Sequence, residues 1–304
     1  MFSIITPTFN RAHLLKRTIK SVLCQTFTDF ELIIVDDGST DSTWEFLNQL
    51  DDKRIRIIKH ELNKGVSAAK NTGLRHITHE WFTILDSDDE MTPNALECFY
   101  NVIIKDSSIE VITCNTRNSI TKKNGGYGWT KEGKVDSIEV LKNFHGEHWG
   151  VIKTTMIGEN KLNEKLGAFE GVFWTKITWG RNRYFISDAL RIYHTDGTDR
   201  ISGNNYYSIE KNYLQYLNLL DEKEFLYLLK TYSLRTYQMY LTEMLLAFLN
   251  YKDYKKAISI IFQINYFLIP IKKTIKILIY IFLGNKIARI TYENKTLLFS
   301  KSKK

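Results

Sequence analysis

The sequence predicts an α/β fold: a mostly parallel sheet with helices on both faces, followed by a C-terminal helical region. In about the first hundred of the 304 residues, short apolar or β-branched runs alternate with longer amphipathic runs, and such alternation gives parallel sheets. From about residue 205 the strand-length runs stop, and Leu, Tyr and Lys recur at helical spacing. A composition with 43% apolar and 25% charged residues is ordinary for a globular protein and excludes a disordered chain.

The first strands are expected in short runs rich in β-branched and aromatic residues, at residues 3–6, 31–36, 54–59, 81–85 and 110–114. Helices are expected between them, where apolar residues recur at helical spacing, at residues 11–25, 42–50, 66–77 and 92–105. The last of these helices should begin with Thr92 as its N-cap and Pro93 in its first turn. Proline is tolerated there because it lacks only an N–H that has no partner within the helix at that position.

From residue 115 the pattern is less regular. Residues 115–130 contain Gly125-Gly126-Tyr127-Gly128, which predicts a hairpin or a mobile loop. After it, helices are expected at residues 137–144 and 169–179, and strands at residues 148–154, 184–186 and 190–194. Three runs at helical spacing follow, at residues 206–220, 222–249 and 254–266. The chain is therefore expected to divide into an α/β domain, residues 1–205, and a helical region, residues 206–304.

The formal charge of +8 is concentrated at the C-terminus. Residues 251–304 hold twelve Lys and Arg against two acids, so the rest of the chain has a charge of −2, which excludes a generally basic nucleic-acid-binding protein. The apolar runs at residues 257–271 and 277–284 are shorter than the roughly 20 residues that cross a bilayer. Lysines beside apolar faces favour a helix lying on an anionic membrane surface. The alternative is a helix packed on the preceding domain, with its lysines solvated.

The cysteines and the N-terminus predict a reduced, cytoplasmic protein. Cys24, Cys98 and Cys114 are too few for a disulfide scaffold, and no CxxC pair suggests a zinc site. The first residues lack the basic and apolar regions of a signal peptide.

Polar segments follow four consecutive expected strands, at residues 6–11, 36–39, 63–65 and 86–89. Ligands of open α/β sheets bind at the carboxyl ends of the strands, so these segments predict the binding site. Asp86 and Asp88, one residue apart, offer oxygens for a divalent cation that also binds a substrate diphosphate. A solvated acidic loop before a helix is the alternative, and the position beside three other polar strand ends disfavours it.

The other strand ends also have two interpretations. Asp36 and Asp37 follow an apolar run and could accept hydrogen bonds from a base or a ribose, although a turn with helix capping would use similar residues. Gly65 either belongs to a plain turn or opens a helix whose amides meet a phosphate. The segment His145-Gly146-Glu147-His148 has the wrong spacing for a helical two-histidine metal site, so it is not counted as one.

These motifs, in this order, resemble family 2 glycosyltransferases; the matching segments are residues 6–11 (TPTFNR), 25–41 (QTFTDFELIIVDDGSTD), 63–71 (NKGVSAAKN) and 85–89 (LDSDD). The resemblance is close over residues 1–115 and extends weakly to about residue 205. It implies a GT-A (Rossmann-like) fold, a nucleotide-sugar donor, expected to be a UDP-sugar, a divalent Mn²⁺ or Mg²⁺, and inversion at the anomeric carbon. Residues 1–115 would be the nucleotide-sugar half and residues 116–205 the acceptor half.

The resemblance also implies roles for individual residues. Thr8 and Asp37 would contact the nucleotide, with Asp37 at the base, and Asp86 would lie by the ribose. Asp88 would bind the metal, with Asp86 and His194 as further candidate ligands. Lys70 stands where the family usually has arginine, and a lysine lacks the bidentate fork. The full set of expected nucleotide-sugar contacts is Thr6, Pro7, Thr8, Asn10, Arg11, Asp36, Asp37, Lys64, Gly65, Lys70, Asn71, Asp86, Ser87 and Arg200.

Inversion needs a carboxylate that takes the proton of the acceptor hydroxyl. The family usually supplies it from an acidic pair that opens a helix, and the matching segment here, residues 167–174 (GAFEGVFW), has one acid, Glu170. Glu170 is the candidate base, because its apolar setting would raise its pKa; an ordinary helix-start glutamate is the alternative. Asp188 is the second candidate.

The resulting expectation is a metal-dependent, inverting glycosyltransferase of the hexosyltransferase type. It would add a sugar to a glycan or lipid-linked acceptor in cell-surface polysaccharide or lipopolysaccharide biosynthesis, as a peripheral protein on the inner face of the membrane. A sugar-nucleotide pyrophosphorylase should have a glycine-rich loop after the first strand, where this chain has Thr6-Pro7-Thr8. A non-catalytic nucleotide-sugar-binding scaffold would have lost the acids that are present here.

Overall fold

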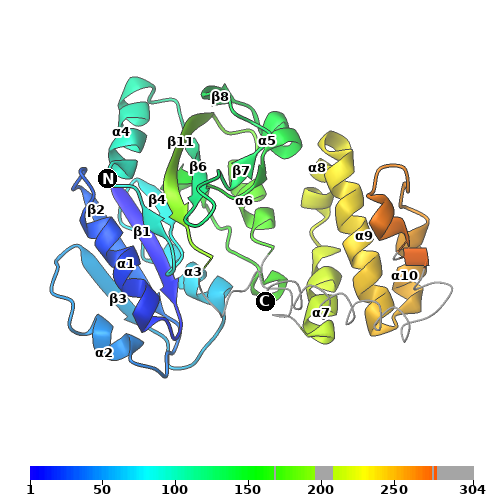
Figure 1. The fold of residues 1–304 in the computed structure, drawn as a ribbon, viewed down its shortest axis with the longest axis horizontal. Coiled ribbons are helices and arrows are strands. Elements are labelled where there is room, and N and C mark those ends of the chain that lie inside the picture. The colour runs from blue at the N-terminus through cyan, green and yellow to red at the C-terminus, as the bar shows by residue number, and fades with distance from the viewer. Residues whose placement is uncertain (168, 196–207, 276, 279–304) are drawn as a thin grey trace. The chain divides into compact units, whose positions relative to one another are not determined.

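The computed structural model describes residues 1–167, 169–195, 208–275 and 277–278 (Figure 1). The chain divides into two compact units, Met1–Arg200 and Ile201–Lys304. The first contains the sheet, and the described part of the second is helical.

The sheet of the first unit has nine strands, in the order β3-β2-β1-β4-β10-β6-β11-β5, with β8 paired to β11. Strands β1 to β4 are parallel to one another, whereas β10 runs antiparallel to both β4 and β6, and β11 is parallel to β6. A separate two-stranded sheet joins β7 and β9. The strands are β1 Phe2–Thr8, β2 Phe30–Asp36, β3 Ile55–Lys59, β4 Trp81–Ile84, β5 Glu90–Met91, β6 Val111–Asn118, β7 Gly126–Tyr127, β8 Gly133–Val135, β9 His145–Gly146, β10 His148–Lys153 and β11 Arg183–Tyr193.

Helices cover both faces of this sheet, which confirms the predicted fold class. Because side chains alternate along a strand, Ile4 and Ile5 of β1 belong to separate hydrophobic clusters. The cluster of Ile4 includes residues of α1, α2 and α4, and that of Ile5 includes residues of α3 and α6. The helices of this unit are α1 Ala12–Leu23, α2 Thr43–Leu47, α3 Val66–Arg75, α4 Ala95–Lys105, α5 Ser137–Asn143 and α6 Gly171–Thr178, with short 3₁₀ turns at Thr154–Met156 and Glu164–Leu166.

Helix α3 lies very close to the central strand β1. A Cβ atom on Gly73 would lie 2.3 Å from Cγ2 of Ile5, so only a glycine permits this approach. The close packing brings Lys70, on the same helix, toward the ends of the central strands. Pro7 is tolerated in β1 because the pairing with β4 ends at Ile5, so no partner on that side needs its missing N–H.

Several predicted boundaries are wrong. Helix α4 begins at Ala95 with Asn94 as its N-cap, because the Thr92 amide donates to the Leu190 carbonyl of β11 and does not enter the helix. The two strands expected at residues 184–186 and 190–194 are one strand, β11, with register shifts on either side of Ala189. The segment after residue 115 continues β6 and then turns back, with Arg117 bridged to Asn124, as a hairpin.

The labelled helices of the second unit are α7 Ile209–Leu219, α8 Lys223–Tyr232, α9 Leu234–Tyr251 and α10 Tyr254–Ile261, and residues 271–275 are also helical. Helix α9 is in contact with each of the other three. The helix expected at residues 222–249 is divided at Ser233, whose φ of −140° ends α8. Within the described parts of the chain, no helix combines the length and the apolar character needed to cross a membrane.

Candidate active site

The ends of β1 and β2 carry two buried polar atoms that lack partners. Thr8 and Asp36 are register partners at the last paired position of these strands. Oγ1 of Thr8 and Oδ2 of Asp36 are buried and make no hydrogen bond with the described residues, while Oδ1 of Asp36 accepts from the Ser39 amide at 3.1 Å. A buried polar atom without a partner costs about 1–3 kcal/mol, so this pair is suited to a ligand that supplies the hydrogen bonds.

Asp37 has a structural task that the sequence did not indicate. Its carboxylate contacts Nδ1 of His60 at 2.7 Å and accepts from the amides of Lys64 at 3.0 Å and Gly65 at 2.7 Å. These bonds fix the loop that leads into α3. They also occupy the amides of Lys64 and Gly65, so both oxygens of Asp37 and both amides already have hydrogen-bond partners in this structure.

Two residues expected to contact the nucleotide sugar, Asn10 and Asn71, make hydrogen bonds to other parts of the protein. Asn10, at φ 53°, accepts from the Thr40 amide at 2.8 Å and links the loop after β1 to the loop after β2. Asn71 donates to the Leu162 carbonyl at 2.9 Å and accepts from the Leu162 amide at 2.8 Å. Both asparagines therefore position loops, because in this structure their side-chain amides are hydrogen-bonded to residues of those loops.

The loop after β4 lies in a network of ion pairs. Lys70, only 4% exposed, places its ammonium 3.2 Å from Asp86 and 2.6 Å from Glu170. The other oxygen of Asp86 lies 3.0 Å from Arg191, which also pairs with Asp89. Although burial opposes it, the positive charges of Lys70 and Arg191 hold the pKa of Asp86 well below its usual range. Asp86 is therefore ionised at neutral pH.

The metal candidates are only partly brought together. Oδ2 of Asp88 lies 3.0 Å from Arg11, and Oδ1 makes no hydrogen bond with the described residues. His194 contacts Glu90 at 2.6 Å through Nε2, so it is turned toward that residue. In the described ranges, no group of three or more His, Cys, Asp or Glu is arranged to hold a metal ion. Asp88 alone fits a cation that takes its remaining ligands from a substrate diphosphate and water.

Glu170 stands at the N-cap of α6, beside Lys70. The expected apolar setting is wrong, because its carboxylate contacts the Lys70 ammonium and its side chain is 23% exposed. Asp188 is exposed in the irregular part of β11 and makes no hydrogen bond or ion pair with the described residues. Of the two candidates, Glu170 is the one that shares the Lys70 ammonium with Asp86.

The other residues expected to contact the nucleotide sugar differ in burial and in hydrogen bonding. Thr6 and Pro7 are part of β1, where Oγ1 of Thr6 is buried without a partner among the described residues. Ser87 is buried and accepts a long, 3.5 Å hydrogen bond from Arg11. The Lys64 side chain is exposed. Arg200 lies outside the described residues.

Two residues of the site were missed by the sequence reasoning. Arg191 is 6% exposed between the apolar residues Leu190 and Ile192, and a charge inside an apolar strand signals a buried partner. Glu147 belongs to the segment that was excluded as a metal motif, and it directly precedes β10, whose Trp149 donates to the Ile84 carbonyl at the end of β4. No short motif marks either residue.

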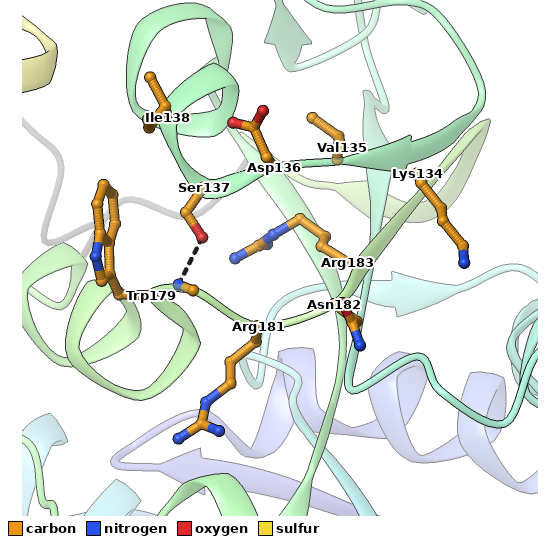
Figure 2. Close-up of a pocket in the computed structure, with 10 residues that line it drawn as sticks. Lys134, Val135, Asp136, Ser137, Ile138, Trp179, Arg181, Asn182 and Arg183 are labelled. Atoms are coloured by element: carbon orange, nitrogen blue, oxygen red, sulfur yellow. Dashed lines mark hydrogen bonds between the residues drawn. The ribbon is translucent and has the colours of Figure 1, made fainter.

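A separate pocket, with a volume of about 510 Å³, contains none of the expected site residues. It is lined by the start of α5 and by residues 179–183, and Figure 2 shows Ser137 bound to the backbone beside Trp179. Arg183, at the amino end of β11, donates to Thr113 and Thr178. This pocket is therefore at the opposite edge of the sheet from the strand ends described above.

Comparison with known proteins agrees with this geometry. The family model described as "Glycosyl transferase family 2" matches residues 3–190. The GalNAc(5)-diNAcBac-PP-undecaprenol beta-1,3-glucosyltransferase of Campylobacter jejuni is 29% identical over 230 residues, which are 73% of this chain and 74% of that protein. The UDP-Glc:alpha-D-GlcNAc-diphosphoundecaprenol beta-1,3-glucosyltransferase WfgD of Escherichia coli is 36% identical over 107 residues, covering 35% of this chain and 42% of WfgD.

The fold also has solved relatives. S. aureus TarS 1–349, solved in complex with UDP-GlcNAc, superposes with a TM-score of 0.61 over 81% of each chain, at 20% sequence identity. At that identity the likeness concerns the fold.

Proposed function

Because the chain belongs to glycosyl transferase family 2, we propose that it transfers a sugar, with inversion, from a UDP-sugar to a lipid-linked or cell-surface glycan acceptor. The names of both glucosyltransferase relatives specify undecaprenol-linked acceptors, and that of WfgD specifies UDP-Glc, which supports this substrate class. The buried carboxylate, hydroxyl and cations at the strand ends provide the matching chemistry.

The observation that carries the proposal is the pair formed by Thr8 Oγ1 and Asp36 Oδ2, two buried atoms without a hydrogen-bond partner among the described residues. Uracil offers an N–H donor beside carbonyl acceptors. The Asp36 oxygen would accept from the N–H, and the Thr8 hydroxyl, which can donate or accept, would satisfy a neighbouring group. Such a site favours uracil over cytosine, whose ring nitrogen at the same position is an acceptor.

The donor diphosphate would lie among Arg11, Lys70 and Arg191, the cations that now pair with the acids after β4. Asp88 would hold a Mn²⁺ or Mg²⁺ ion, which when bound neutralises charge on the leaving diphosphate. Lys70 would then exchange its contact with Glu170 for a phosphate oxygen. This exchange frees the Glu170 carboxylate to accept the proton of the attacking hydroxyl.

The second unit would attach the enzyme to the membrane that holds a lipid-linked acceptor. In support, Phe262 is 86% exposed, Phe267 is 99% exposed and Ile271 is 74% exposed, close in sequence to the exposed Lys272. Exposed aromatic and aliphatic side chains beside lysines match an anionic bilayer surface.

The uracil contact is tested by calorimetric titration of UDP and CDP, in the presence of Mn²⁺, into wild-type protein and Asp36→Asn. Because the Ser39 amide keeps the asparagine oxygen in place, the new NH₂ occupies the position of Oδ2 and faces the uracil N–H. We expect the wild type to prefer UDP over CDP, and the substitution to weaken UDP binding by about tenfold or more and to reduce the preference.

Asp41→Asn is the matched control, because Asp41 is an exposed acid of the same loop. It should leave both affinities unchanged. Equal UDP affinity of Asp36→Asn and the wild type would contradict the assignment of Asp36 to the base.

A further inference from the structure

Glu147 lies at the sheet edge where β4 ends. It directly precedes β10, which is antiparallel to β4 and β6, so the first residues of β10 are at the carboxyl ends of those strands. Two residues further on, Nε1 of Trp149 donates to the carbonyl of Ile84 at 2.9 Å, and Ile84 is two residues before Asp86. This contact brings the Glu147 segment beside the acidic loop.

The backbone of Glu147 is held on both sides. Its amide donates to the Gly125 carbonyl at 3.1 Å, and its carbonyl accepts from Oγ1 of Thr116 at 3.0 Å. The backbone position from which the Glu147 side chain extends is therefore fixed by hydrogen bonds.

The carboxylate of Glu147 differs from its acidic neighbours in having no partner. Asp86, Asp88 and Glu170 each pair with a lysine or arginine, whereas the Glu147 carboxylate makes no hydrogen bond or ion pair with the described residues. Its side chain reaches solvent.

The charge of this carboxylate limits what it can bind. It would repel the diphosphate of the donor, and Arg191 and Lys70 are already paired with other acids. A neutral hydrogen-bond donor is a match for such a carboxylate, and the hydroxyls of a sugar are such donors. Lys70 joins Glu170 to Asp86, and the Glu147 segment lies beside the loop that contains Asp86.

We propose that Glu147 accepts a hydrogen bond from a hydroxyl of the acceptor sugar and so determines which acceptor is bound and how it is oriented. This inference rests on the proposed glycosyltransfer. Glu147 is an acceptor-binding residue in this scheme, and the proton still goes to Glu170.

The test compares Glu147→Ala and Glu147→Gln with the wild type in a coupled assay of UDP release. The substrates are UDP-glucose and a synthetic lipid-diphosphate-linked α-N-acetylglucosamine, chosen after the acceptor of WfgD. For Glu147→Ala we expect the KM for the acceptor to rise by about tenfold or more, with kcat and the KM for UDP-glucose within about threefold of the wild type. Glu147→Gln keeps a side-chain oxygen that can accept a hydrogen bond, so it should raise the KM for the acceptor sugar by less than Glu147→Ala does.

Glu159→Ala, at an exposed loop glutamate, is the matched control and should leave all three constants unchanged. An unchanged acceptor KM in Glu147→Ala, with an active wild type, overturns this inference alone. A collapse of kcat at constant acceptor KM also overturns it, since that result would make Glu147 the proton acceptor. A wild type that releases no UDP from this pair overturns the proposed function instead.

Discussion

At the residue scale, one buried arginine organises the acidic loop. Arg191 contacts Asp86 at 3.0 Å through one guanidinium nitrogen and Asp89 at 2.7 Å through Nε. Asp89 is 1% exposed, so its charge depends on this partner. Burial, reinforced by Asp86 and Asp88, raises the pKa of Asp89 to about 6 even with Arg191 present.

We therefore predict that Arg191→Leu destabilises the protein strongly, because it leaves a buried carboxylate without a cation. The expected loss in the free energy of unfolding is about 3–5 kcal/mol, measured by urea denaturation at pH 7. Lys153→Ala, which breaks the more exposed pair between Lys153 and Glu80, should cost at most about 1 kcal/mol. A similar small loss for Arg191→Leu would show that the arginine does not hold the loop.

The sequence predicted which segments meet at the site better than it predicted what each residue does there. Thr8 and Asp36 end two strands, and Asp86 follows a third, that are neighbours in the sheet, so strand order alone brings them together. The partners of Asn71 and Arg191 are about a hundred residues away in the chain, and no local spacing encodes such contacts. This is why Asn71 was assigned to the donor and Arg191 was not assigned at all.

At the element scale, the fit of α3 on β1 depends on a glycine. We predict that Gly73→Ala destabilises the protein by about 1–3 kcal/mol, because its Cβ would overlap Ile5 in the core. The displaced helix carries Lys70, so UDP affinity should fall as well. Thermal and urea unfolding, with UDP titration, measure both effects.

Gly171→Ala is the matched control in helix α6, because a Cβ there would meet no atom within 4 Å. Its stability should be unchanged or higher by up to about 1 kcal/mol. Equal stability of the two alanine variants would contradict the close packing of α3 on β1.

The boundaries that the sequence missed have tertiary causes. The end of α8 at Ser233 has no glycine or proline to mark it, and the Ser233 amide still donates an α-helical hydrogen bond to the Leu229 carbonyl. The strand β11 continues across its irregular centre because β6 pairs with it on both sides of the register shifts. Periodicity predicts that an element exists, whereas its ends depend on partners elsewhere in the chain.

At the scale of the whole molecule, membrane attachment assigned to the second unit predicts vesicle binding. The full chain should sediment with phosphatidylglycerol vesicles at low salt and less with phosphatidylcholine vesicles, and added salt should weaken binding. The double variant Phe262→Ser and Phe267→Ser should lose most of the binding. Tyr227→Ser, at a 64% exposed aromatic of α8, is the control. Absence of wild-type binding to anionic vesicles at low salt would contradict the attachment.

The central claim is that the strand ends and Glu170 together form a glycosyltransfer site. The most direct test is the turnover of Glu170→Gln with UDP-glucose and the lipid-diphosphate-linked N-acetylglucosamine, alongside calorimetric titration of UDP. We expect kcat to fall by about a hundredfold or more, because no carboxylate takes the hydroxyl proton, while UDP affinity stays within a few-fold of the wild type. Normal turnover of Glu170→Gln with intact UDP binding would contradict it.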